Sequence, residues 1–226
     1  MKSLIIFICS VAMVMFFALG SFKGADVSDA NYSALQRVNK SLVLTQPPTS
    51  LPDFSFEKAG KVAFTNESLL GKWTILFVGY TYCPDICPTT LAHLDHVYPE
   101  LTNDDKTTTQ VVFVSVDPNR DKAEQLADYV NYFNANFIGV TSTHKQLWPF
   151  VTQLGLSYSI VEEGDTDDDL YLIDHSASII LINPKGEFHA TFKSEVNAQG
   201  INNVDMDKMA IDIKDIQDNY NPSSSD

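Results

Sequence analysis

The chain is short of cysteine and of basic residues, and each shortage excludes a class of protein. It has 3 cysteines among 226 residues, and Cys9 lies in an apolar N-terminal segment. A disulfide-stapled scaffold uses more cysteines than this. Lysine and arginine total 15 against 29 acidic residues, a formal net charge of −14. So acidic a chain is a poor ligand for nucleic acid and for anionic lipid headgroups.

Several common signatures are also absent. The sequence contains no internal repeat, no glycine-rich phosphate loop and no Gly-x-Ser-x-Gly nucleophile elbow. These absences argue against a repeat protein, a phosphate-loop nucleotide-binding protein and a serine hydrolase built on that elbow.

The first 23 residues have the composition of a membrane anchor or signal segment. Residues 4–22 form a run of 19 residues without a charge, flanked by Lys2 and Lys23. The run is long enough to span a bilayer, and Lys2 favours a cytoplasmic N-terminus. Residues 18–20 are an acceptable cleavage site, so a retained single-pass anchor and a cleaved signal both remain open. We expect a bacterial cytoplasmic membrane protein whose domain faces the periplasm, since the arginines of a mitochondrial presequence are missing.

Composition divides the rest of the chain into three parts. Residues 24–51 are polar and end in a proline-rich stretch, which predicts a linker. Residues 52–220 are long enough for one domain with a sizeable core. The serine-rich residues 221–226 are expected to be a disordered tail.

Hydrophobic periodicity predicts alternating strands and helices in the domain. The expected strands are a hairpin at 54–64, buried strands at 73–80 and 111–116, a short strand at 137–140, and a hairpin formed by 178–182 and 188–192. Apolar stripes at helical spacing predict helices over 91–101, 126–133, 147–154 and 206–216. This order predicts an α/β sandwich with a mixed β-sheet flanked by helices.

Two cysteines follow the first buried strand. Cys83 and Cys87 are four positions apart, with Pro84 and Pro88 beside them. A dicysteine motif at this place points to a thioredoxin-like fold. Residues four apart on one turn face the same way, and their Cα atoms lie about 6 Å apart, within reach of a disulfide. A helix N-terminus also favours the thiolate, so we expect a reactive pair that acts together.

The spacing of the pair leaves more than one chemistry open. Thioredoxin-type oxidoreductases use Cys-x-x-Cys, and the lone-cysteine motif of a peroxidase is absent. A thiolate pair prefers Cu(I), and an added imidazole, for which His175 is the candidate, gives a site that also holds Cu(II). Zinc would have an incomplete shell. The alternatives are a thiol–disulfide reductase and a structural disulfide, although closing so short a loop stabilises little.

Three motifs in combination resemble the Sco/SenC family. They are Gly79–Pro88, Ser115–Asp121, and Asp174-His175-Ser176 followed by Asn183-Pro184-Lys185-Gly186. The resemblance covers roughly residues 52–216. The family comprises membrane-anchored, thioredoxin-like copper proteins that assist cytochrome c oxidase assembly.

The resemblance implies a site and a role. By it, Cys83 and Cys87 are the copper thiolates, His175 is the imidazole ligand, and Cu(I) and Cu(II) are both bound. It implies a metallochaperone rather than an enzyme, which delivers copper to the CuA centre of oxidase subunit II or to another acceptor. The alternative is a thiol–disulfide oxidoreductase that reduces that subunit's cysteines. In either case the thiols must be kept reduced, so a periplasmic thiol reductase is an expected partner.

Other polar residues near these motifs have structural and functional interpretations. Asp85 either supports the metal ligands or acts as a favourable charge at a helix start. Asp117 either faces the site from the end of its strand or forms a turn. His93 and His96 lie off the apolar stripe of their helix and are expected to be solvated. The acidic run at 162–169 is expected to be a solvated loop.

Overall fold

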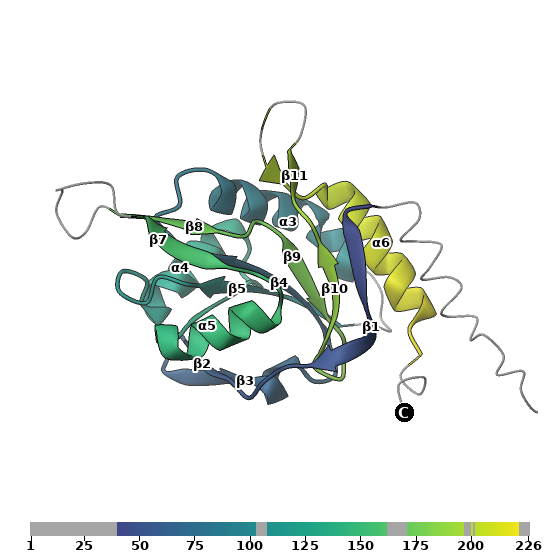
Figure 1. Ribbon diagram of the computed structural model, residues 1–226, viewed down its shortest axis with the longest axis horizontal. Helices are drawn as coiled ribbons and strands as arrows, with labels where there is room; N and C mark the ends of the chain where they lie inside the picture. Colours follow the sequence, from purple (N-terminus) through teal and green to yellow (C-terminus); the bar gives the residue numbers. More distant parts are fainter. Residues whose placement is uncertain (1–39, 103–107, 162–170, 197–199, 201, 222–226) are drawn as a thin grey trace, which may run out of the picture.

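An eight-stranded mixed sheet forms the centre of the computed structural model, which describes residues 40–102, 108–161, 171–196, 200 and 202–221 (Figure 1). Its strands are, in spatial order, β1 (Leu42–Ser50), β10 (Glu187–Phe192), β9 (Ile179–Ile182), β4 (Trp73–Gly79), β5 (Thr109–Ser115), β6 (Ile138–Thr141), β2 (Ser55–Lys58) and β3 (Val62–Thr65). β4, β5 and β6 run parallel, whereas β9 is antiparallel to β4 and β10 is antiparallel to β9.

Helices cover both faces of this sheet. They are α3 (Ile86–Thr102), α4 (Ala123–Phe133), α5 (His144–Gln153) and α6 (Met206–Asn219), with a short 3₁₀ helix, η1 (Asn66–Leu69). α3 contacts both α4 and α6, so these three helices form one layer. α5 lies in front of the sheet in Figure 1, on the opposite face. The predicted α/β sandwich with a mixed sheet is therefore confirmed.

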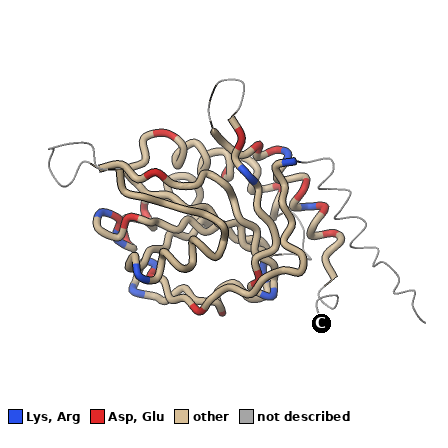
Figure 2. Tube along the Cα trace, viewed as in Figure 1, with Lys and Arg blue, Asp and Glu red and all other residues tan. Residues whose placement is uncertain are grey.

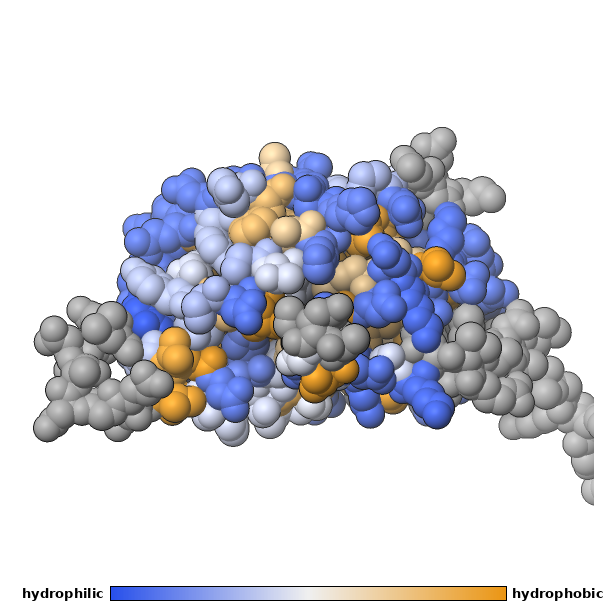
Figure 3. All heavy atoms as spheres, turned by 90° about the horizontal axis from the view of Figure 1, so that it is seen from above, coloured by the Kyte–Doolittle hydropathy of each residue, from blue (hydrophilic) through white to orange (hydrophobic). Residues whose placement is uncertain are grey.

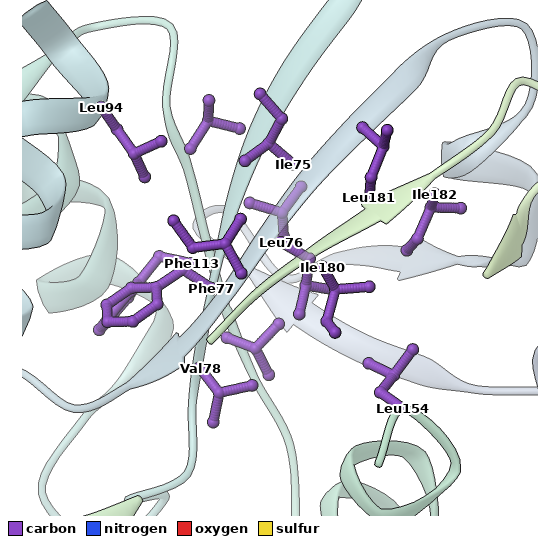
Figure 4. Close-up of a cluster of buried hydrophobic side chains, with 14 of the residues drawn as sticks. Ile75, Leu76, Phe77, Val78, Leu94, Phe113, Leu154, Ile180, Leu181 and Ile182 are labelled. Atoms are coloured by element: carbon purple, nitrogen blue, oxygen red, sulfur yellow. The ribbon is translucent and has the colours of Figure 1, made fainter. Parts of the chain in front are cut away.

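The core is made by the central strands. Every residue of β4 and β5 is buried, as expected for strands covered on both faces. Figure 4 shows Leu94 of α3 on one side of these strands and Leu154, just after α5, on the other. Charged residues lie on loops, on helices and on outer strands such as β2 and β10, and they are absent from β4 and β5 (Figure 2). Seen from above, the surface is mostly hydrophilic, with small separate hydrophobic areas (Figure 3).

The expected linker differs from the structure at its end. Residues 42–50 form β1, which pairs antiparallel with β10 at the edge of the sheet. Leu42 and Leu44 are buried, so hydrophobic contact with the sheet fixes this otherwise polar stretch. The ordered domain therefore begins before residue 52.

Two short strand pairs were not predicted. β7 (Tyr158–Val161) pairs with β8 (Leu172–His175), and β11 (Glu195–Val196) pairs with β12 (Asn202–Asn203). The acidic run at 162–169 and the tail at 222–226 lie outside the described residues, as does the expected anchor at 1–23. Within the described part of the chain, no helix is long and apolar enough to cross a membrane.

Candidate metal centre

The two cysteines lie where β4 passes into α3. Cys83 is in the connecting turn, where its backbone N–H donates to the Tyr80 carbonyl at 3.3 Å. Cys87 is the second residue of α3 and is fully buried, while Cys83 is 8% exposed. Both thiols are free. Because β4 and β5 are parallel, this turn lies at the carboxyl edge of the sheet, where open α/β folds place their ligands.

Gly79 makes room for the inner thiol. A Cβ on Gly79 would lie 2.6 Å from Cys87 Sγ and 2.7 Å from Cε2 of Phe113, both far inside van der Waals contact. Glycine at the end of β4 is therefore what allows Cys87 to pack against the strand.

His175 reaches the cysteines from a different element. It is the last residue of β8, and its Nε2 lies 3.4 Å from Cys87 Sγ. Its Nδ1 lies 3.2 Å from the carbonyl oxygen of Ser176, which can only accept a hydrogen bond. In the neutral ring Nδ1 therefore carries the proton, and the lone pair of Nε2 faces the thiols.

The three side chains form one compact donor set. One ligand atom from each of Cys83, Cys87 and His175 lies within 4.8 Å of the other two. Zinc–thiolate and zinc–imidazole bonds, at about 2.3 Å and 2.0 Å, give the scale of a metal site. Donors bonded to one ion are thus separated by up to about 4.6 Å. The cluster fits a thiophilic metal ion after only small side-chain shifts, and two thiols with an imidazole suit copper.

The environment makes the two thiols unequal. The hydrogen bond from Cys87 lowers the pKa of the Cys83 thiol far below its usual value. Burial raises the pKa of Cys87. The outer sulfur is therefore the stronger candidate for thiolate in the metal-free protein, and the inner one is the proton donor to it.

Two aromatic rings pack against the half-buried imidazole. The Tyr80 ring meets His175 edge-on at 5.8 Å between centroids, and Phe77 lies 6.1 Å away. Tyr80 is 2% exposed, so this side of the site is closed to water.

The other predicted site residues lie at varied places. Asp117 is buried and binds Arg120 and Tyr171, so it belongs to the surroundings of the site and not to the donor set. Asp85 is exposed before α3. His93 and His96 are exposed on α3, as expected.

Two residues beside the site were missed as functional. Asp121 binds the cysteine loop through Thr81, and Arg120 contacts Tyr82 and Tyr171. Their place directly after a parallel strand was the available signal, because strand ends of α/β sheets gather at one edge.

The fold and the donor set define a class: a thioredoxin-like α/β protein with a Cys-x-x-x-Cys and histidine cluster at the carboxyl edge of its sheet. Residues 44–207 match the SCO1/SenC family, and the chain belongs to that family. The expected family and the thioredoxin-like fold are thereby confirmed.

Individual relatives agree with this assignment. The chain is 32% identical over 164 residues to a protein of Stutzerimonas stutzeri described as copper-binding, covering 73% of this chain and 79% of that one. It is 38% identical over 141 residues to mitochondrial SCO2 of Saccharomyces cerevisiae, covering 62% of this chain and 45% of the yeast protein. The crystal structure of Arabidopsis thaliana ScoI with copper bound superimposes with a TM-score of 0.63 at 31% identity, covering 74% of this chain and 98% of that chain. The match with yeast SCO2 spans less than half of the yeast protein.

Proposed function

We propose that this protein is a copper-binding metallochaperone that assists assembly of the CuA centre of cytochrome c oxidase. The observation that carries the proposal is the donor set itself: two free thiols and one imidazole converge within 4.8 Å. Membership of the SCO1/SenC family and a copper-bound relative, the Arabidopsis protein, support copper as the cargo.

The three residues have separate parts in this proposal. Cys83 and Cys87 bind soft Cu(I) as thiolates, with Cys83 already biased toward that form. His175 presents the Nε2 lone pair and favours Cu(II), for which imidazole is a better ligand. A site that holds both oxidation states can accept copper in one and release it in the other. The acceptor in this proposal is oxidase subunit II or another copper protein.

An anaerobic copper titration of the reduced full chain tests the proposal. We expect one tight Cu(I) equivalent, which Cys83→Ser and Cys87→Ser each abolish. His175→Ala should spare most Cu(I) binding and weaken Cu(II) binding, because only the imidazole is lost. His96→Ala, which removes an exposed imidazole from α3, is the matched control. If His175→Ala weakens Cu(I) and Cu(II) binding equally, the separate roles given to the thiols and the imidazole are contradicted.

A thiol–disulfide reductase is the second candidate, and the inequality of the two thiols favours it specifically. In this reaction the Cys83 thiolate attacks a disulfide of the substrate protein and forms a mixed disulfide, releasing one substrate thiol. Cys87 then attacks Cys83, which frees the second substrate thiol and leaves a Cys83–Cys87 disulfide. An external thiol reductant, such as a periplasmic reductase, returns the pair to its reduced form.

Trapping distinguishes this reductase from the chaperone. Cys87→Ser should accumulate a mixed disulfide on Cys83, and Cys83→Ser should form none, while His175→Ala should leave turnover nearly unchanged. Failure of Cys87→Ser to trap any substrate would remove the reductase from consideration.

We also propose a location. Residues 1–23 would hold the protein in the bacterial cytoplasmic membrane by a single span, with the domain in the periplasm; the uncharged run of 19 residues after Lys2 supports this. Protease added to intact spheroplasts should digest the domain. Protection of the domain until lysis would contradict the proposal.

A further inference from the structure

We propose that the turn from Asp117 to Asp121 is a positioning clamp that sets the distance between the cysteine loop and His175. The turn begins two residues after the end of β5 and is the point where the two halves of the site are tied together. This inference deepens the proposed function, on which its copper readouts rest.

One arm of the clamp holds the cysteine loop. Asp121 has no solvent exposure, and its Oδ2 accepts hydrogen bonds from the Thr81 backbone N–H at 2.9 Å and from Ser115 Oγ at 2.6 Å. Its Oδ1 accepts from Thr81 Oγ1 at 2.5 Å. Three donors on one buried carboxylate leave it little freedom. Because Thr81 lies two residues before Cys83, this arm fixes the loop to the end of β5.

The other arm reaches the strand that carries the histidine. The Arg120 guanidinium carbon lies 3.7 Å from the centre of the Tyr171 ring and 4.8 Å from that of Tyr82. Arg120 Nη1 also donates to the Tyr171 carbonyl at 2.9 Å. Tyr171 immediately precedes β8, and Tyr82 immediately precedes Cys83. One guanidinium therefore touches the neighbours of both halves of the donor set.

Asp117 fixes the direction of that arm. It is 1% exposed and accepts from Arg120 Nε at 2.5 Å and from the Tyr171 hydroxyl at 2.5 Å. Its own N–H donates to Ser115 Oγ at 3.1 Å. A buried ion pair adds little net stability, but its geometry is well defined. Asp117 thus holds Arg120 and Tyr171 together against the end of β5.

Tyr80 links the clamp to the imidazole. Arg120 lies 5.7 Å from the centre of the Tyr80 ring, and the same ring meets His175 edge-on. Loss of Arg120 would release Tyr80 and Tyr171 together, so β8 and His175 would shift relative to Cys87. Cys83 stays in the turn between β4 and α3, and Cys87 stays on α3. The clamp should therefore matter more for the imidazole than for the thiolate pair.

The decisive variant is Arg120→Lys in the full chain. Lysine keeps the charge beside Asp117 but cannot stack on Tyr171 while donating to its carbonyl. We expect Cu(II) affinity to fall roughly 10-fold to 100-fold, as for other residues that orient metal ligands, while Cu(I) affinity changes far less. Lys122→Ala removes a positive charge from the residue that follows the turn, whose Nζ donates to the Pro118 carbonyl, and should behave as wild type. Wild-type Cu(II) affinity in Arg120→Lys would overturn the clamp.

Metal-free measurements separate this inference from the proposed function. With selectively labelled histidine, the His175 imidazole resonances should shift in Arg120→Lys and stay in place in Lys122→Ala. In Asp121→Asn, which tests the other arm if Arg120→Lys does not fold, the alkylation rate of Cys83 should rise relative to that of Cys87. If neither the resonances nor the rates move, the clamp is wrong even if copper binds. If both move and the wild type binds no copper, the clamp stands and the copper function fails.

Discussion

At the scale of single residues, the donor set depends on groups that never touch a metal. The Ser176 carbonyl selects the tautomer of His175, and Gly79 leaves space for Cys87. Each acts through geometry: one directs a lone pair, the other admits a sulfur.

Gly79→Ala should damage the site and the fold together. The added methyl would overlap Cys87 Sγ and the Phe113 ring, and overpacking of this kind costs about 1–3 kcal/mol. We expect a lower melting temperature and faster alkylation of Cys87, measured by mass spectrometry on the metal-free protein.

Gly71→Ala is the matched control for that variant. Gly71 has a φ of +75°, which disfavours alanine, but no atom lies within 4 Å of the added Cβ. It should lower stability without changing Cys87 reactivity. An unaltered melting temperature and alkylation rate in Gly79→Ala would contradict the packing argument.

At the scale of elements, β1 is part of the domain and should contribute to its stability. A chain beginning at Pro52 lacks the buried Leu42 and Leu44 and leaves the edge of β10 unpaired. At about 1.5–3 kcal/mol for each buried leucine, we expect a loss of several kcal/mol relative to a chain beginning at Lys40. Urea unfolding of the two chains measures it. Equal midpoints would show that β1 is a dispensable linker after all.

The contact between β10, β4 and the end of α6 should make stability depend on pH. His189 is 5% exposed and meets Trp73 and Tyr220 edge-on. Burial lowers its pKa from 6.5 to about 4. The unfolded chain therefore binds a proton at a higher pH than the folded one. The contribution of neutral His189 to the free energy of unfolding is fully present above about pH 6.5. It is lost as pH falls toward about 4, and the total loss is on the order of 3 kcal/mol.

His189→Phe keeps the edge-on ring contacts and removes the titration. Chemical denaturation between pH 4 and pH 7 should show a flatter stability profile for the variant than for the wild type. Identical profiles would assign the acid sensitivity to other groups.

The sequence predicts elements well where their signal is local. The apolar runs of β4, β5 and β9 and the stripes of α3 and α6 depend on neighbouring residues only. β1 was missed because it contains Pro47 and Pro48 and few apolar residues, so only its pairing with β10 makes it a strand. The β7–β8 pair likewise depends on pairing between two strands that the acidic run separates in the sequence.

The same distinction applies to the site. Cys83 and Cys87 follow from one motif, since four-residue spacing fixes their proximity. The position of Arg120 and Asp121 after a strand could place them near the site, but it could not identify their partners, because Tyr171 and Thr81 lie 51 and 40 residues away in the chain. Sequence spacing carries no information about such contacts.

At the scale of the whole molecule, the acidic, mostly hydrophilic surface surrounds a small site with one half-buried ligand, His175. The net charge of −14 should keep the domain in solution. We expect a partner protein to dock through a surface that is not strongly acidic. Specificity for a metal therefore comes from the three donors and their supports, and not from the overall field, which attracts any cation.

X-ray absorption by the Cu(II)-loaded full chain shows directly whether the three donors bind one ion. We expect two sulfur ligands and one imidazole nitrogen at the same ion, with the imidazole scattering lost in His175→Ala and retained in His96→Ala. A spectrum with oxygen and nitrogen ligands only, or an imidazole signal that survives in His175→Ala, would contradict it.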